Sequence, residues 1–247
     1  MTTAVFAPGG YRYIPAVFQY SGGVVAERGY EIVRVRFHRP VPLARGFARI
    51  ADAIRAAGRP RTAFCACELR SPEPFTEDGF RAFNQVYAGI LGEWGLFDGA
   101  TNPVARSNVC PEIDPPPEPS FHAFCFTVAS QAAPTFVVAG SAEALEGKAN
   151  YRDHTIRLGE TSGDAMREKA QFVLGEMERR LAALGFAWKD TTATQVYTVQ
   201  NIHPFFANEI VRRGAATNGL TWQYCRPPVR GLEYEMDCRG VGKESVV

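Results

Sequence analysis

The sequence has almost no net charge, because 27 Lys and Arg residues balance 26 Asp and Glu residues to a formal charge of +1. Nucleic acids and anionic membrane surfaces are bound through clustered positive charge, so this balance supports neither partner and argues against a nuclease. No apolar run approaches the ~20 residues of a membrane-spanning helix. The first ten residues, "MTTAVFAPGG", lack the basic and apolar regions of a secretory signal. We therefore expect a cytoplasmic protein with no nucleic-acid or membrane partner.

The sequence also lacks the features of a disulfide scaffold or a metal protein. A chain of 247 residues does not need a disulfide framework to fold, and no signal peptide suggests an oxidising compartment. Cys65 and Cys67 share one face of a predicted strand, but no second Cys or His pair follows at zinc-like spacing. We expect packed thiols, no metal and no cofactor.

Hydrophobic patterning predicts alternating strands and helices. Runs of β-branched and aromatic residues predict strands at residues 16–26, 30–38, 62–69, 105–110, 120–129, 135–145, 191–199, 220–228 and 231–241. Apolar residues at helical spacing predict helices at residues 43–58, 77–95, 162–185 and 202–214. Ser162 or Asp164 is the expected cap of the long third helix.

Two strand pairings are also expected. The first two strands, 16–26 and 30–38, are predicted to form a hairpin. Strands 105–110 and 120–129 are predicted to pair across the proline-rich turn "DPPPEP". That second pairing would bring Arg106 and His122 close together.

The order of elements repeats along the chain. "RTAFCACEL" followed by "GFRAFNQVY" matches "TTATQVYTV" followed by "PFFANEIV", and "SFHAFCFTV" matches "LEYEMDCRGV". We predict an α+β fold of two tandem units, residues 1–130 and 131–247. Each unit is expected to contain a mostly antiparallel sheet with two helices on one face.

Several stretches resemble the RidA/YjgF family of enamine/imine deaminases. "QYSGGVV", "RVRFHRPVPL", "GFRAFNQVYAGIL" and "ARSNV" resemble family segments in the first half. The long helix with its following strand, and "RPPVRGLEYEMDCRGV", resemble family segments in the second half. The resemblance implies two tandem chorismate-mutase-like units. It also implies a homotrimer with sites at unit interfaces. Within the family, the 2-aminomuconate-type deaminases of aromatic catabolism are the specific match that we expect.

In the first half, the resemblance implies three substrate-binding residues, Tyr20, Asn84 and Arg106. His38 falls at the position of the family's serine. His122 stands where the family has a water-positioning glutamate, and Asn108 replaces its cysteine.

In the second half, Gly140 and Asn208 match substrate-binding positions, and Glu233 matches the glutamate. The arginine position holds Gly219. Each half thus departs from the family at a different point, and we expect Arg106 of one unit to combine with Glu233 of another in a composite site.

The chemistry of these residue types suits hydrolysis of a small 2-amino-unsaturated carboxylic acid. An iminium carbon is already electrophilic, so the reaction needs a carboxylate clamp and a group that orients water or moves a proton. Arginine is the best clamp, because its planar fork makes two parallel bonds to a carboxylate. His122, with an ordinary pKa of ~6.5, or Glu233 would serve the second task. We therefore assign catalytic roles to Arg106, His122 and Glu233.

Two other interpretations remain open. Arg34, Arg36 and His38 share a strand face, which is either a solvated edge or a surface that attracts a dianionic substrate. The changed serine and glutamate positions also fit a non-catalytic carboxylate-binding or regulatory module of the same family. A chorismate-cleaving enzyme shares the fold, but none of its distinguishing pattern is visible.

Overall fold

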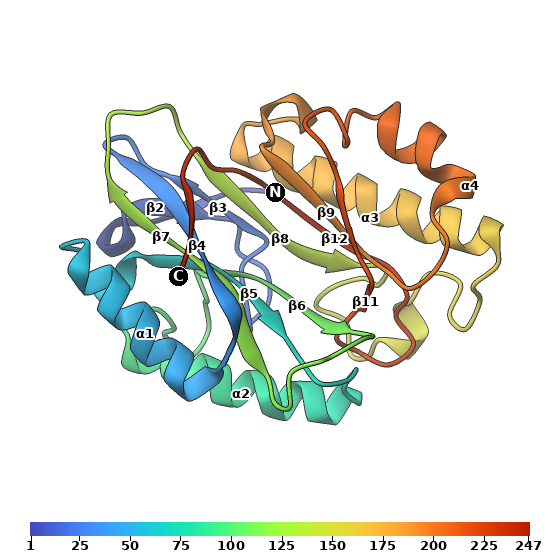
Figure 1. The fold of residues 1–247 in the computed structure, drawn as a ribbon, viewed down its shortest axis with the longest axis horizontal. Helices are drawn as coiled ribbons and strands as arrows, with labels where there is room; N and C mark the ends of the chain where they lie inside the picture. Colours follow the sequence, from blue (N-terminus) through green and yellow to red (C-terminus); the bar gives the residue numbers. More distant parts are fainter.

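The computed structural model describes all 247 residues, Met1–Val247. Figure 1 shows four layers, in which two sheets lie face to face between two layers of helices. The helices α1 (Leu43–Ala56) and α2 (Glu77–Glu93) cover one sheet. The long helix α3 (Gly163–Leu184) and the short α4 (His203–Phe205), which continues as a π-helix over Phe206–Val211, cover the other. None of these helices combines the length and apolar composition of a bilayer crossing.

The first sheet has six strands in the order β11-β6-β5-β7-β4-β13. Their bounds are β4 Tyr30–Pro42, β5 Phe64–Arg70, β6 Ala105–Pro111, β7 Ser120–Ala129, β11 Cys225–Arg226 and β13 Glu244–Val246. Most neighbours run antiparallel, but β5 pairs parallel with β6, and β13 pairs parallel with β4.

The second sheet has seven strands in the order β1-β2-β3-β8-β12-β9-β10. Their bounds are β1 Ala4–Phe6, β2 Tyr11–Tyr13, β3 Gly23–Ala26, β8 Phe136–Ala142, β9 Ala193–Tyr197, β10 Thr221–Gln223 and β12 Glu235–Gly240. The predicted α+β fold of two sheet-and-helix units is confirmed. The boundary at residues 130/131 stays a prediction. Strands do exchange across it, because β1–β3 join the later sheet, and β11 and β13 join the earlier one.

Both predicted strand pairings are wrong. The predicted hairpin of 16–26 with 30–38 does not form, because β3 pairs with β2 and β8, whereas β4 pairs with β7 and β13. The strands at 105–110 and 120–129 are not neighbours either, because β5 lies between β6 and β7. The strands β1, β2 and β13 were not predicted. Each has only three residues, too few to carry a recognisable alternation.

Local sequence explains the helices well. Apolar side chains at Phe47, Ile50 and Ile54 give α1 one buried stripe. The side chain of Thr76 caps α2 by accepting the backbone N–H of Gly79, and Ser162 caps α3 by accepting that of Ala165. Of the two caps that the sequence suggested, Ser162 and Asp164, the structure therefore selects Ser162.

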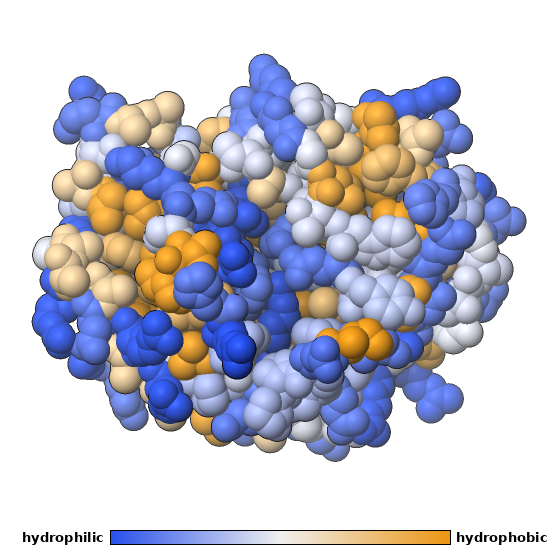
Figure 2. Space-filling model, in the orientation of Figure 1, coloured by the Kyte–Doolittle hydropathy of each residue, from blue (hydrophilic) through white to orange (hydrophobic).

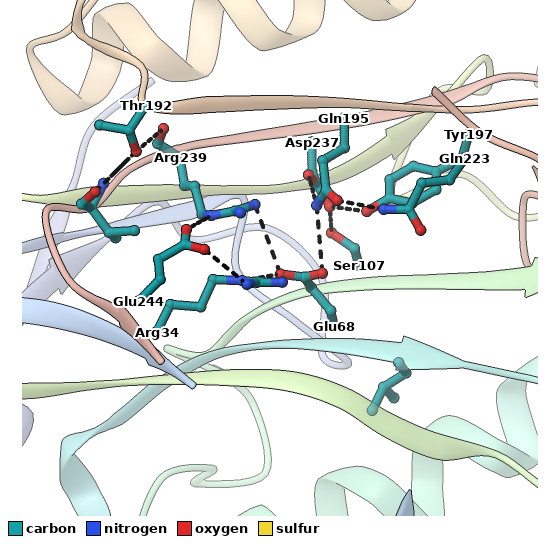
Figure 3. A network of polar contacts seen from close by, with 12 residues as sticks. Arg34, Glu68, Ser107, Thr192, Gln195, Tyr197, Gln223, Asp237, Arg239 and Glu244 are labelled. Carbon is teal, nitrogen blue, oxygen red and sulfur yellow. Dashed lines mark hydrogen bonds and ion pairs between the residues drawn. The ribbon is translucent and has the colours of Figure 1, made fainter. Parts of the chain in front are cut away.

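The two helix–sheet cores differ in composition, and the space between the sheets holds a polar network as well as an apolar cluster built from strands of both sheets. Aromatic rings fill the first core, where Phe47 makes edge-to-face contacts with Phe121 and Trp94. The second core is mostly aliphatic and methionine-rich. Between the sheets lies the network in Figure 3, in which Arg34 binds Glu68 at 2.7 Å and Glu244 at 3.1 Å. Hydrophilic atoms also dominate the middle of the face in Figure 2.

Candidate active site

Arg106 is a buried cation without an acidic partner. It lies within β6 at 3% exposure, and its Nη2 donates to Asn84 Oδ1 at 2.7 Å. The guanidinium carbon lies 4.8 Å from the ring centre of Tyr87 and 5.4 Å from that of Tyr20. Its Nη1 is buried and has no hydrogen-bond partner. A buried guanidinium with a free N–H favours an anionic ligand, because an unsatisfied buried charge is costly.

The side chains around Arg106 come from α2, which packs on this sheet. Phe80, Phe83, Asn84 and Tyr87 recur at helical spacing, so all four reach the same guanidinium. Their rings hold the cation through cation–π contacts. The local sequence "GFRAFNQVY" thus supplies both the amide that orients Arg106 and the aromatic wall around it.

A second unpaired donor lies two residues further along β6. Asn108 is buried, accepts the Ser71 hydroxyl on Oδ1 at 2.9 Å, and has no partner for Nδ2. Because β-strand side chains alternate, Asn108 and Arg106 lie on the same side of β6. Both line one small cavity of ≈ 40 Å³.

Glu235, the first residue of β12, lines the same cavity from the other sheet. It is buried, and its carboxyl takes part in none of the hydrogen bonds or ion pairs of the structure. Burial raises the pKa of Glu235 well above its usual value, the charge of Asp237 raises it further, and Arg106 opposes the shift. A carboxyl whose pKa is raised in this way can hold a proton and pass it to a bound ligand.

Gly140 makes room for this carboxyl. A Cβ atom at position 140 would overlap Oε1 of Glu235 and would lie 3.2 Å from the Cα of Ser107. The glycine therefore allows β8, the Glu235 side chain and β6 to approach closely. Its predicted place in the site has a steric explanation.

A larger cavity of ≈ 550 Å³ adjoins the small one, and the two share Tyr20, Phe80, Glu146 and Tyr151 as lining residues. The larger volume is typical of a small-molecule site. The Tyr20 hydroxyl donates to Glu146 Oε1 at 2.9 Å. Glu146 is also held by Arg180 at 2.8 Å. One face of α2 forms one wall of the larger cavity, and residues 145–151 form another.

Four predicted site residues meet around these cavities. Arg106, Asn84, Tyr20 and Gly140 all line one or both of them. They come from different strands, a helix and a loop, so only the fold brings them together. Their functional roles stay predictions.

The two predicted histidines do not line either cavity. His122 lies on β7, which β5 separates from β6. Burial and the nearby Arg70 lower its pKa to about 3, so it is neutral at physiological pH rather than poised near 6.5. His38 is exposed on β4, where its backbone N–H donates to the Val247 carbonyl oxygen.

Asn208 and Glu233 also lie outside both cavities. Asn208 is exposed on the π-helix. Glu233 is half-buried, accepts from Gln200 Nε2 at 3.0 Å and lies 3.8 Å from Arg226 Nη1. The second unit does contribute a glutamate beside Arg106, but it is Glu235 rather than the expected Glu233.

The strand at 30–38 is not a free edge, because β13 pairs with it, and its Arg34 is not open to an anion. Arg34 is 5% exposed and is engaged by Glu68 and Glu244. Figure 3 shows this pair between the two sheets, beside Arg239 and Asp237. The structure therefore favours a structural role for Arg34 over attraction of a substrate.

The cysteines are buried free thiols, and Cys67 Sγ lies 3.3 Å from the Tyr87 hydroxyl. Burial raises the pKa of Cys67 to about 12, so the thiol stays protonated. No group of three His, Cys, Asp or Glu side chains is arranged to hold a metal ion. The polar side chains that line the small cavity include the hydrogen-bond donors Arg106 and Asn108 and the carboxyl of Glu235. These groups are suited to binding an organic acid.

Comparison with known proteins gives a consistent picture. The family model of the 2-aminomuconate deaminase CnbZ matches residues 3–245. A 2-amino-5-chloromuconate deaminase from Comamonas testosteroni is 54% identical over 246 residues, which is 98% of each chain.

Solved structures are more distant. The match to a crystal structure of chorismatase covers 98% of this chain and 80% of the chorismatase chain, with 11% identity and a TM-score of 0.48. The YjgF gene product from E. coli matches 44% of this chain and 81% of its own, with 12% identity and a TM-score of 0.32.

Proposed function

The chain belongs to the 2-aminomuconate deaminase family, and we propose that it hydrolyses a 2-aminomuconate-type dicarboxylate and releases ammonia. The observation that carries this proposal is the small cavity between the sheets. One side supplies the unpaired N–H of buried Arg106, and the other supplies the unpaired, protonatable carboxyl of Glu235.

In the proposed mechanism, Arg106 binds the carboxylate next to the amino-bearing carbon. Its guanidinium is held by Asn84 and the aromatic wall, so little reorganisation is needed when the substrate arrives. The free Nη1 and the free Asn108 Nδ2 supply the donors. The bound carboxylate also neutralises Arg106, which removes one of the charges that lower the pKa of Glu235.

Glu235 then moves the proton and holds the water. Protonation of the enamine carbon gives an iminium, and water adds to the C=N carbon to form a carbinolamine. The amine takes up a proton and leaves as ammonia, while the carbinolamine hydroxyl becomes the new carbonyl. The net reaction is enamine plus water to ketone plus ammonia. No step needs a metal, because the iminium carbon is already electrophilic.

Replacing Arg106 tests the proposal directly. Arg106→Lys keeps the charge but loses the planar fork, and Arg106→Ala loses both. Truncating one partner of a buried charged contact costs about 2–5 kcal/mol, so we expect kcat/KM to fall by roughly 30-fold or more. The measurement is ammonia release from an enamine acid generated in situ.

The control is the circular dichroism spectrum and the urea midpoint of each variant. Unchanged ammonia release from well-folded Arg106→Lys and Arg106→Ala would contradict the proposal. Carboxylate binding by the unsubstituted protein without any ammonia release would favour the non-catalytic binding module instead.

Three further expectations accompany this proposal. A homotrimer with sites at unit interfaces, a cytoplasmic location and a role in aromatic catabolism all stay predictions. The 54%-identical relative is a 2-amino-5-chloromuconate deaminase, which supports a muconate-derived substrate, including a chlorinated one. The apolar residues Ala142, Val229 and Leu232 of the small cavity are compatible with a substituent on the carbon chain.

A further inference from the structure

The larger cavity contains two cations that the proposed mechanism does not use. Arg81 lies on α2 and Lys148 lies in the segment 145–151, so one stands on each wall. Both side chains are exposed, and neither takes part in any ion pair of the structure. Arg81 is three residues before Asn84, so it lies about one helical turn from the residue that holds Arg106.

The acidic residues of the same cavity are already engaged. Glu77 Oε1 accepts the backbone N–H groups of Tyr151 at 3.1 Å and Arg152 at 3.3 Å. Glu146 is engaged by Tyr20 and Arg180. Glu146 is therefore paired with a cation and Glu77 is held by backbone N–H groups, whereas Arg81 and Lys148 have no partner.

From this arrangement we infer that Arg81 and Lys148 bind the second, distal carboxylate of the substrate. Arg106 holds the carboxylate beside the amino-bearing carbon in the small cavity, and the carbon chain extends past Tyr20 and Phe80 into the larger cavity. The two outer cations select a dicarboxylate over a monocarboxylate of the same chain length. This inference rests on the proposed function for its orientation, but its test does not depend on catalysis.

The test uses two unreactive six-carbon acids that differ in one carboxylate. Muconate (hexa-2,4-dienedioate) carries two, and sorbate (hexa-2,4-dienoate) carries one. Titration calorimetry of the full-length protein would give both Kd values at low salt. We expect muconate to bind roughly 3- to 30-fold more tightly than sorbate, because two partly solvated ion pairs add to the Arg106 contact. The preference should shrink as NaCl is added.

The double variant Arg81→Gln/Lys148→Gln should bring the two Kd values to within about 2-fold and leave sorbate binding unchanged. Arg45→Gln is the matched control, because Arg45 is an exposed α1 arginine outside both cavities. It should keep the full preference. Equal binding of both acids by the unsubstituted protein would overturn the inference, and so would a preference that survives in the double variant.

This experiment is separate from the test of the proposed function. If ammonia release fails but the muconate preference is present and lost in the double variant, the dicarboxylate site stands and the deaminase proposal falls. If ammonia release depends on Arg106 but the double variant keeps its preference, the deaminase stands and the distal site falls.

Discussion

The two sheet-and-helix units use the same order of elements for different purposes. In the first unit, β6 and α2 bring Arg106 and Asn84 together. In the second unit, the matching positions are Gly219, in a turn with φ of 96°, and Asn208, exposed on a π-helix. The second unit supplies Gly140 and Glu235 to the first unit's cavity instead. Residues from both halves of the chain thus line one cavity at the junction between the sheets.

The helices also differ in what they bury. The buried residues of α1 and α2 are uncharged, whereas α3 buries Lys169 and Arg180. Lys169 Nζ lies 3.0 Å from Glu143 Oε1, and both side chains are 0% exposed. Glu143 also accepts the backbone N–H groups of Glu233 and Tyr234, just before β12 begins. In the second unit, a buried ion pair therefore holds the backbone segment that leads into Glu235.

Removing that ion pair should produce the largest effect. Lys169→Met leaves Glu143 buried without its cation, and breaking a buried pair from one side costs about 3–5 kcal/mol. We expect the urea unfolding free energy at pH 7 to fall by about that amount. Arg167→Met is the control, because Arg167 pairs with Asp164 on the exposed side of the same helix and should change stability by less than about 1 kcal/mol. Equal losses in the two variants would show that the ion pair is unimportant.

Replacing Glu235 tests which glutamate of β12 belongs to the site. Glu235→Gln should lower kcat/KM by about 100-fold, a typical loss for a group that moves a proton. It should also remove the pH dependence that this carboxyl contributes to the rate. Glu233→Gln, two residues away and outside the cavity, should stay within about 3-fold. The reverse ranking would restore the role that the sequence assigned to Glu233.

Glu235 also predicts a pH effect on stability, whose sign follows from its raised pKa. Above the unfolded pKa of ~4.3, the unfolded chain releases this proton while the folded chain keeps it. The folded state then binds more protons than the unfolded state, so this group lowers stability as pH rises toward its folded pKa. Gln carries no such proton. The stability of Glu235→Gln relative to the unsubstituted protein should therefore increase between pH 4 and pH 8.

Local patterns predicted much of the fold, but not its long-range pairing. The helix over residues 162–185 and the strand over residues 120–129 match α3 and β7 within one residue. Apolar spacing and a Ser162 cap are local signals, so they can be read from a single segment. The exchange of β1–β3 into the later sheet depends on partners more than 100 residues away, as in the pairing of Val24 with Val137. No local pattern encodes such a partner.

The candidate site shows the same limit. Arg106, Asn84 and Tyr20 were identified through family resemblance and do lie together. His122 was misplaced because the predicted pairing of its strand with that of Arg106 is wrong, since β5 intervenes. Glu233 and Glu235 have the same alternation, so sequence alone could not separate them. Their difference depends on β12 beginning at Glu235, which leaves Glu233 before the strand.

The smallest expected effect compares the two matching asparagines. Asn84→Ala removes the acceptor of Arg106 Nη2 and leaves a second buried N–H unsatisfied, so we expect kcat/KM to fall by roughly 10-fold. Asn208→Ala removes an exposed amide on the π-helix and should change kcat/KM by less than about 2-fold. Steady-state kinetics and urea midpoints of both variants would separate activity from stability. If Asn208→Ala proved as harmful as Asn84→Ala in a well-folded protein, the second unit would hold a working site of its own. Since the second unit has Gly219 at the arginine position, the arginine of that site would have to come from another chain. The asymmetry between the units would then be only apparent.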